Sequence, residues 1–378
     1  MKDKNINPFA LVSYNGPAYF CDREVETKSL ISNIKSGLHT SLFAIRRLGK
    51  TSLIKHCFYK LSKQKDYLCL YIDIFQTQNI QEFNNLLATT IYQQLYPKPR
   101  WLQVIKKFVS ALRPVISIDE LSGLPQLSID FKLPKQYEKT IPTLFQFLEK
   151  QPYKTVIAID EFQQILKFPE TNVEAILRTS IQHLKNVIFV FSGSNQAMMF
   201  QIFQTTKRPF YASCSSLFLD KIPISIYAAY IQKHFNDNNK PLPDECIYFI
   251  LNWTCVHTFY TQYFCNYVYN HYESTIDIHK IKKMAYTILL QEQGNYFQIR
   301  ELLTKPQYKL LTAIAKEERV FNKYKFSFLQ QYTLGAASSV DRGIQALIQH
   351  DLIYFQSTKD QAYYEVYDKF LMRWLQRL

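Results

Sequence analysis

The sequence predicts an α/β domain built on a parallel sheet, followed by a helical region and a small C-terminal domain. Short β-branched and aromatic runs alternate with helical stretches over the first 220 residues, and these runs are apolar on both faces. Strands of that kind, separated by helices, are typical of a parallel sheet covered on both sides. From Pro223 the pattern is helical and rich in Tyr and Phe, and from Pro306 three helical stretches precede two β-like runs.

One stretch interrupts the rhythm of the α/β core. Residues 101–140 fit neither a strand nor a covering helix, so we interpret them as a hairpin-like insertion between the second and third strands. The predicted domains are a core at 1–222, a helical lid and linker at 223–303, and a winged-helix domain at 304–378. The predicted core strands are 41–45, 67–75, 155–160, 187–192 and 217–222.

Three helices and a two-stranded wing are the elements of a winged-helix domain. In its third helix, Ser339 is expected to cap the N-terminus. The apolar residues Val340, Ile344, Leu347 and Ile348 recur at helical spacing, so we expect all four to face the core.

Composition indicates an ordinary globular chain of two or three domains, because 47% of the 378 residues are apolar and 20% are charged. The apolar runs are too short to span a bilayer, so no membrane partner is expected. The N-terminus lacks the apolar stretch of a signal peptide. Seven cysteines occur without CxxC or Cys/His ligand spacing, which favours reduced thiols and a cytoplasmic location.

The formal net charge of +14 permits an anionic partner, including weak and non-specific DNA binding, although a lysine-rich solvated surface explains it equally well. In the third helix of the C-terminal domain, only Arg342 and Gln345 are good candidates for contacting bases, and Asp341 would oppose phosphate. We therefore expect this domain to dock a partner and to regulate, rather than to read a DNA sequence.

The segment FAIRRLGKTSL, residues 43–53, nearly matches the phosphate-binding pattern GxxxxGK[ST]. Ala44 stands where the pattern has its first glycine, at the end of a strand, where alanine is tolerated if φ stays negative. Gly49, which allows close approach of the backbone to phosphate, is present. Taken alone, the segment fits a basic strand-to-helix turn as well as it fits a nucleotide site.

Each residue type in this loop has a role that phosphate chemistry requires. Lys50 would reach the β- and γ-phosphates of ATP, and the Thr51 hydroxyl would ligate Mg²⁺. Backbone N–H groups at the start of a helix would face the phosphates. The candidate ATP- and ADP-binding residues of the loop are Arg46, Arg47, Leu48, Gly49, Lys50, Thr51 and Ser52.

The segment TVIAIDEF, residues 155–162, supplies the second half of a nucleotide site. It predicts a buried strand that delivers two acids at its carboxyl end, where open α/β sheets bind ligands. Asp160 would hold Mg²⁺ through water, and Glu161 would polarise the attacking water as the catalytic base. The alternative is a helix N-terminus that merely favours acidic residues.

An adjacent Asp and Glu indicate the AAA+/ASCE-type ATPases, in which another strand lies between the loop strand and the acidic strand. The segment NVIFVFSGSN fits that central strand and would place Ser192, Ser194 or Asn195 near the γ-phosphate as a sensor. We assign this catalytic role to Ser194. A plain Ser/Gly turn is the alternative explanation.

Arg208 precedes the fifth strand, where an arginine finger projects into a neighbouring subunit in ring-forming ATPases. Arg178, on the helix after the acidic strand, is a second candidate, and a solvated surface arginine is the ordinary alternative. His257 would contact nucleotide from the helical lid, unless it is an inert, partly buried histidine.

These motifs resemble those of the bacterial and archaeal AAA-type ATPases of the archaeal ATPase family. That family is allied with the signal-transduction ATPases with numerous domains and with origin-recognition-type loaders. The chain departs from it at Ala44 and Ile45, where a small residue followed by proline is usual. The matching segments run nearly from end to end: NPF (7–9), YFCDRE (19–24), RRLGKTSLI (46–54), IDEFQQI (159–165), LRTSIQH (177–183), FSGSNQAMM (191–199), RPFY (208–211), HTFYTQ (257–262) and VYDKFLMRWL (366–375).

The resemblance implies a P-loop NTPase core, a helical lid and a winged helix, with the segment through Pro8, Phe9 and Arg23 closing over the adenine. We therefore expect an ATPase that hydrolyses ATP slowly and acts as a switch. In its ATP state it would form a homo-oligomer or engage an unidentified protein partner. The alternative is an ATP-dependent DNA-binding or loading protein that uses its winged helix. An inactive scaffold is disfavoured because the loop and the acidic pair are intact.

Overall fold

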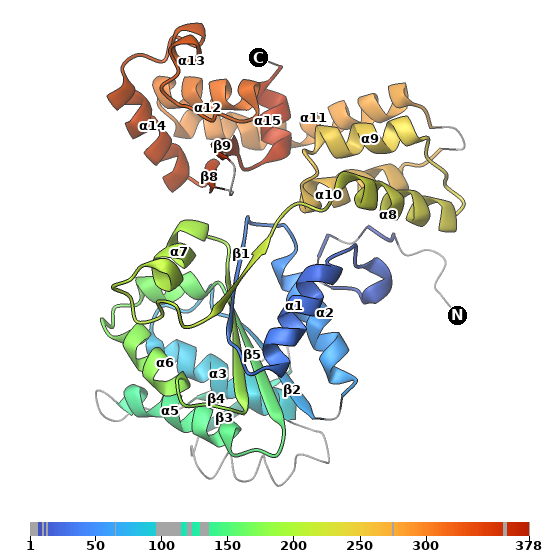
Figure 1. Cartoon of the computed structure of the whole chain (residues 1–378). Helices are drawn as coiled ribbons and strands as arrows, with labels where there is room; N and C mark the ends of the chain where they lie inside the picture. The colour runs from blue at the N-terminus through green and yellow to red at the C-terminus, as the bar shows by residue number, and fades with distance from the viewer. Residues whose placement is uncertain are drawn as a thin grey trace. The chain divides into compact units, whose positions relative to one another are not determined.

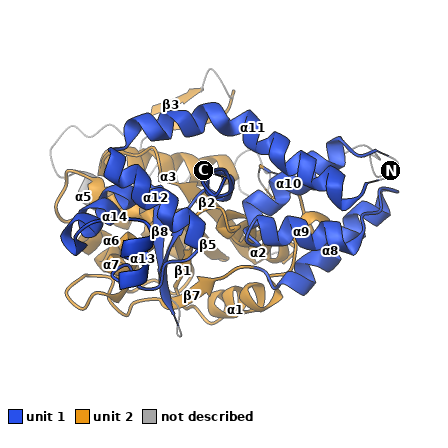
Figure 2. Cartoon of the chain, turned by 90° about the horizontal axis from the view of Figure 1, so that it is seen from above, with its two compact units in different colours: residues 1–11, 222–378 blue, residues 12–221 orange. Residues whose placement is uncertain are grey.

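The computed structural model describes residues 7–9, 11–12, 14–64, 66–95, 115–118, 123–128, 136–273, 276–357 and 361–377. The chain divides into two compact units (Figure 2). The sheet unit spans residues 12–221, and the helical unit comprises residues 1–11 and 222–378. Of the helices in the described ranges, none combines the length and apolarity needed to cross a membrane.

The sheet unit contains a parallel five-stranded sheet in the order β2-β5-β6-β1-β7. The predicted parallel sheet is confirmed, and β6 lies between the loop strand β1 and the acidic strand β5, as the Asp-Glu pair indicated. Strands β1, β5 and β6 are almost wholly buried because their residues are apolar on both faces. The strand bounds are β1 Thr40–Ala44, β2 Tyr67–Asp73, β5 Lys154–Asp160, β6 Val187–Gly193 and β7 Ser215–Leu219.

Helices cover both faces of the sheet: α1 and α2 lie on one face, and α3, α5, α6 and α7 lie on the other (Figure 1). On the second face, phenylalanines from strands and helices form an apolar core that includes Phe145, Phe162, Phe189, Phe191 and Phe203. The bounds are η1 Pro17–Tyr19, α1 Glu24–Lys35, α2 Lys50–Ser62, α3 Ile80–Leu95, α5 Gln136–Glu149, η3 Phe162–Lys167, α6 Val173–Ile181 and α7 Gln196–Gln204.

A small antiparallel hairpin, β3 Val115–Ile118 and β4 Pro125–Ser128, lies in the stretch interpreted as an insertion. Three hydrogen bonds tie it to α3: the Thr89 hydroxyl donates to the Leu127 carbonyl at 3.2 Å and accepts from the Leu127 amide at 3.0 Å, and the Gln93 side-chain amide donates to the Pro125 carbonyl at 2.8 Å. Residues 101–114, 119–122 and 129–135 of this stretch lie outside the described residues.

The helical unit begins with four helices, α8 Ile224–Asp237, α9 Asp244–Trp253, α10 Thr258–Asn270 and α11 Ile278–Leu302. Phe9 is fully buried in this unit. Its ring lies 5.0 Å from that of Phe235 on α8 and 6.2 Å from that of Tyr269 on α10. The segment through Phe9 is therefore anchored to these two helices.

The winged-helix arrangement is confirmed: α12, α13 and α14 precede the antiparallel pair β8 and β9, and α15 ends the fold. Two details differ from the prediction. Helix α14 begins at Ala337 with Ala336 as its N-cap, so Ser339 lies inside the helix and does not cap it. The bounds are α12 Lys305–Glu317, α13 Phe326–Gln331, α14 Ala337–Gln349, β8 Ile353–Ser357, β9 Ala362–Val366 and α15 Lys369–Leu375.

The second difference concerns the buried face of α14. Val340, Ile344 and Leu347 are buried as expected, but Ile348 is 40% exposed. Gly343 takes the remaining core position, because Leu310 of α12 approaches it so closely that a Cβ there would lie 2.7 Å from a Leu310 methyl carbon. The inward face therefore consists of Val340, Gly343, Ile344 and Leu347, and Ile348 lies outside it.

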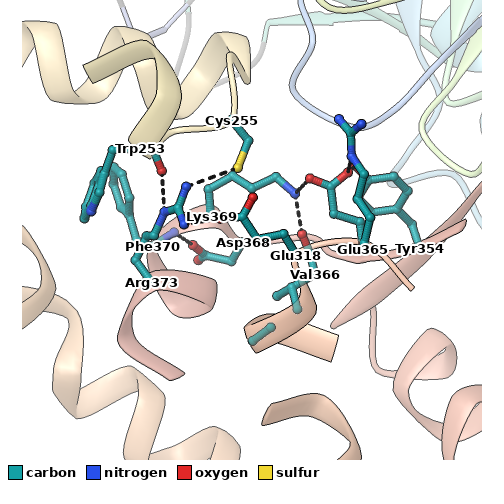
Figure 3. Close-up of polar contacts among 12 residues, drawn as sticks. Trp253, Cys255, Glu318, Tyr354, Glu365, Val366, Asp368, Lys369, Phe370 and Arg373 are labelled. Carbon is teal, nitrogen blue, oxygen red and sulfur yellow. Dashed lines mark hydrogen bonds and ion pairs between the residues drawn. The ribbon is translucent and has the colours of Figure 1, made fainter. Parts of the chain in front are cut away.

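Charged residues of α15 form buried contacts within the helical unit (Figure 3). Lys369 is fully buried and pairs with Glu365 at 2.8 Å, and the Tyr354 hydroxyl donates to the same carboxylate at 2.7 Å. Arg373 donates to the backbone carbonyls of Trp253 at 2.7 Å and Asn252 at 3.0 Å, at the end of α9. Directed hydrogen bonds thus fasten α15 of the winged helix to the end of α9.

Candidate nucleotide-binding site

The segment 43–53 forms a strand, a tight turn and a helix. Ala44 ends β1 with negative φ, so its side chain is compatible with the turn. Gly49, with φ of 99°, is the N-cap of α2. Nothing would obstruct a Cβ at Gly49, so it is the left-handed backbone that favours glycine here. Arg47 also has positive φ, at 63°. The turn thereby brings Lys50 to the first position of α2.

Asp160, at the end of β5, accepts hydrogen bonds on both carboxylate oxygens. The Thr51 hydroxyl donates at 2.8 Å and the Tyr71 hydroxyl at 2.7 Å to one oxygen. The Ser192 hydroxyl donates at 2.6 Å and the Glu161 amide at 3.0 Å to the other. Four donors, from β2, β6, α2 and the residue directly after β5, therefore hold a single acid at the carboxyl edge of the sheet.

Electrostatics keep this acid ionised although it is buried. Burial opposes the charged form of Asp160, but the hydrogen bond from Ser192 and the charge of Lys50 outweigh it, so its pKa is lowered. Burial lowers the pKa of Lys50, while the charges of Asp160 and Glu161 oppose that shift. The two residues therefore stabilise each other's charged form.

Glu161 sits in left-handed backbone, with φ of 56°, directly after β5. Its carboxylate accepts a hydrogen bond from the Ser194 hydroxyl at 2.7 Å and from the Gln163 side chain at 2.5 Å. Gly193 makes room for this arrangement, because a Cβ there would overlap the Gln163 amide oxygen. The structure thus brings the predicted base and the predicted sensor into direct contact.

The donor set at this edge suits Mg²⁺. A hydroxyl and a carboxylate 2.8 Å apart, on Thr51 and Asp160, offer the hard oxygen ligands that Mg²⁺ takes while keeping several waters. In the described parts of the chain, no three His, Cys, Asp or Glu side chains form a metal-binding group. Any Mg²⁺ held here would therefore complete its coordination with water and phosphate oxygens.

Three residues near Asp160 and Glu161 were missed by the sequence analysis: Tyr71, Asp73 and Gln163. Tyr71 and Asp73 lie on β2, and Asp73 is the register partner of Asp160. Burial, with the nearby charges of Asp160 and Glu161, raises the pKa of Asp73. In the sequence, the acidic residue at the end of the segment YLCLYID could have identified Asp73 as a site residue. That inference requires knowing that β2 pairs with β5, which the sequence does not show.

The two candidate arginines occupy different environments in the sheet unit. Arg208 forms an ion pair with Glu174 of α6, a carboxylate that is almost buried. Burial raises the pKa of Glu174, and the charge of Arg208 opposes that rise. Arg178 is half-buried on the same helix. An intramolecular partner for Arg208 means that a role in a neighbouring subunit would require this pair to open.

The residues assigned to adenine and lid contacts are distributed over both units. Pro8, Phe9 and His257 belong to the helical unit and are buried there, and His257 is the N-cap residue of α10. Arg23 belongs to the sheet unit, in left-handed backbone before α1, where it pairs with Glu26 at 2.9 Å. Their contact with nucleotide stays a prediction.

The sheet unit matches the family model described as an "ATPase domain predominantly from Archaea" over residues 20–221, more than half of the chain. The chain therefore belongs to this ATPase family, which confirms the resemblance seen in its motifs. A second model, a "probable winged helix domain", matches residues 294–377. No protein with curated annotation matches the sequence.

Solved structures resemble the chain over nearly its whole length. A Walker-type ATPase of Pyrococcus abyssi has a TM-score of 0.65 and 16% identity, with 98% of this chain and 100% of that chain covered. The ORC2 protein of Aeropyrum pernix, in ADPNP–ADP complexes, has a TM-score of 0.55 and 12% identity, with coverage of 98% and 97%. At these identities the likeness shows the fold: a P-loop ATPase core with a C-terminal winged helix.

Proposed function

We propose that this protein binds ATP with Mg²⁺, hydrolyses it slowly, and uses the nucleotide state as a switch. The observation that carries the proposal is the meeting of Thr51, Asp160 and Glu161 at one edge of the sheet, with Thr51 and Asp160 2.8 Å apart. Lys50 begins the adjoining helix and would neutralise the phosphates. Family membership and the nucleotide complexes of ORC2 support the choice of ATP and ADP.

Slow turnover follows from the way the catalytic groups are held. Ser194 and Gln163 both donate to the same oxygen of Glu161, Oε2, so the carboxylate is held by its neighbours and would have to present its other oxygen to a water to act as a base. Arg208 must likewise leave Glu174 before it can reach a neighbouring subunit. We propose that formation of a homo-oligomer, or engagement of a protein partner, in the ATP state supplies these rearrangements.

The direct test is the size of the purified protein with Mg²⁺ and either ADP or a non-hydrolysable ATP analogue. A larger species with the analogue, reverting with ADP, is the expected result for a switch. The same experiment with duplex DNA separates assembly on DNA from assembly on nucleotide alone. An unchanged size and an absence of ATP hydrolysis would together contradict the proposal.

A second candidate function, ATP-dependent DNA binding, is favoured by the winged helix and by the fold of the Aeropyrum pernix ORC1 protein. That protein was solved in complex with DNA, and it has a TM-score of 0.50, 11% identity and coverage of 98% of this chain and 96% of that chain. Helix α14 offers few side chains that could contact DNA. Asp341 is acidic and already accepts hydrogen bonds from Lys323 and Tyr324, so only Arg342 and Gln345 remain as candidates for contacting bases. Salt-resistant binding to one duplex sequence, lost in Arg342→Ala, would promote this candidate to the main function.

A further inference from the structure

A cavity of about 720 Å³ lies in the helical unit, where the end of α11 meets α12 and the turn after α13. Four cationic side chains line it: Arg300 from α11, and Lys305, Lys309 and Lys316 from α12. One carboxylate, Glu301, shares the lining, so the charge of the cavity is strongly positive.

The lysines of α12 follow one face of the helix. Lys305, Lys309 and Lys316 are separated by four and seven residues, which places them along one side. At 1.5 Å of rise per residue, the row extends over about 16 Å. All three side chains are exposed, as is Arg300, and none of the four forms an ion pair within the described ranges. These charges are therefore available to a ligand.

The remaining lining provides a polar and aromatic wall. The Arg300 guanidinium lies 5.8 Å from the centroid of the Tyr308 ring, and the Tyr308 hydroxyl is shielded from water without a hydrogen-bond partner among the described residues. Lys309 donates to the Thr333 carbonyl at 3.0 Å, which fixes its position and uses one of its three N–H donors. Two donors on Lys309 remain for an anion.

We propose that this cavity binds a small polyanion that carries several phosphate groups, a ligand separate from the ATP of the sheet unit. Arginine binds phosphate through two parallel hydrogen bonds and lysine binds it as a point charge, so the four cations match linked phosphates. The volume lies in the range typical of small-molecule pockets, which is about 300–1,000 Å³. A nucleic-acid strand or an acidic peptide would lie mostly outside a cavity of this size.

The test is calorimetric titration of the full-length protein with inorganic tripolyphosphate at physiological salt. The titration uses the Lys50→Ala protein, in which the proposed ATP site is disabled, so any binding observed comes from elsewhere. Failure of the cavity proposal can then be distinguished from failure of the proposed ATP site. We expect a site that Lys305→Glu/Lys309→Glu weakens by more than about tenfold. The matched control Lys283→Glu, at an exposed position on α11, should stay within about twofold.

A second variant guards against a folding defect in the charge reversal. Arg300→Gln removes one cation without adding a negative charge, and we expect about a tenfold loss of affinity with unchanged thermal unfolding. Absence of tripolyphosphate binding in the Lys50→Ala protein, or equal affinity in the cavity and control variants, overturns the proposal. The proposal is also overturned if a short oligoglutamate or a single-stranded oligonucleotide binds more tightly than tripolyphosphate and the same variants abolish that binding. The ligand would then be a macromolecule.

Discussion

The hydroxyl of Thr51 donates a 2.8 Å hydrogen bond to the carboxylate of Asp160, although 109 positions separate the two residues in the chain. Thr51 lies in the first turn of α2, after β1, and Asp160 ends β5, so the contact exists only because β6 spaces the two strands correctly in the sheet. A divalent cation that replaced the shared proton would have both oxygens as ligands, directly or through water.

Replacing Lys50 should remove ATP binding while leaving the fold intact. We expect Lys50→Ala to weaken ATP affinity by on the order of 100-fold, because it deletes a buried cation at the phosphate end of the site. Lys60→Ala, at an exposed position on the same helix, is the matched control and should bind normally. Calorimetry measures both. Unchanged affinity in a folded Lys50→Ala protein would remove the site assignment.

Glu161→Gln should keep nucleotide binding and lower the turnover number by about 100-fold or more, because the amide cannot accept a proton from water. Ser194→Ala should cause a smaller loss, about tenfold, with the Michaelis constant unchanged, since it removes one hydrogen bond to the Glu161 carboxylate and leaves the carboxylate itself.

Asn195→Ala is the control for the Glu161 and Ser194 variants. The Asn195 side chain caps α7 by accepting from the Met198 amide, so its loss should cost about 1 kcal/mol of stability and leave turnover unaltered. Steady-state kinetics and thermal unfolding separate the two effects. Wild-type turnover in Glu161→Gln would give Glu161 another role.

The elements of the fold could be predicted because hydrophobic patterning is local. Strand β5 follows from four consecutive apolar residues before Asp160, and α10 follows from its aromatic periodicity. The partners of Asp160 could not be predicted in full. Tyr71 meets it only because β2 pairs with β5 in a particular register, and register depends on side chains that are distant in sequence.

The buried face of α14 shows where apolar patterning places a residue in the core wrongly. Apolar spacing alone places Ile348 in the core, since it cannot anticipate that Leu310 packs directly over Gly343. Similarly, RPFY identified Arg208 as a candidate finger without revealing its partner Glu174. In both cases the missing information is a tertiary contact, which the sequence alone does not contain.

Arg208 should act on a neighbouring subunit, so ATPase activity per chain should rise with protein concentration. Mixing inactive Arg208→Ala with inactive Glu161→Gln should then restore some turnover, because a mixed pair can assemble one intact site. Strictly additive activity, independent of concentration, would reduce Arg208 to a structural residue.

A double variant separates the two roles of Arg208. Arg208→Ala leaves the nearly buried Glu174 carboxylate unpaired and should destabilise the sheet unit by about 1–3 kcal/mol. Adding Glu174→Ala should restore much of that stability. If Arg208 is a finger, turnover should stay low in the double variant, whereas a purely structural arginine predicts that stability and turnover recover together.

His39 should make the sheet unit sensitive to acid. Burial lowers the pKa of His39 from 6.5 to about 4, and its Nδ1 accepts a hydrogen bond from the Phe189 amide at 3.2 Å, which requires that nitrogen to be unprotonated. Between pH 6.5 and about 4, the unfolded chain binds a proton that the folded chain excludes. The folded state therefore loses stability as pH falls through this window, by up to about 1.4 kcal/mol per pH unit.

The check on His39 is urea unfolding at several pH values, with His39→Gln as the comparison. Glutamine keeps a hydrogen-bond acceptor near the Phe189 amide but does not titrate. The stability of the His39→Gln protein should therefore fall less steeply than that of the wild type over the same pH range. Equal slopes for the two proteins would show that other groups, Glu174 for example, govern the acid response.

The pair of Lys369 and Glu365 should stabilise the winged helix only while both charges are present. Both side chains are almost completely buried, with the Tyr354 hydroxyl as a third member of the group (Figure 3). The Arg319 side chain lies 3.9 Å from the Glu365 carboxylate. Lys369→Met leaves Glu365 buried without its main counter-ion, and we expect a loss of about 3–5 kcal/mol in the free energy of unfolding.

The double variant Lys369→Met/Glu365→Leu tests why Lys369→Met is costly. If the cost is an uncompensated charge, apolar groups of similar size at both positions should recover most of the lost stability. Urea unfolding followed by the fluorescence of Trp374, which packs on Tyr296 within the helical unit, reports on the relevant region. A single variant that costs less than about 1 kcal/mol would show that Arg319 and solvent already compensate Glu365. A double variant no more stable than the single would mean that directed hydrogen bonds to Glu365, rather than charge balance, hold α15 against β9.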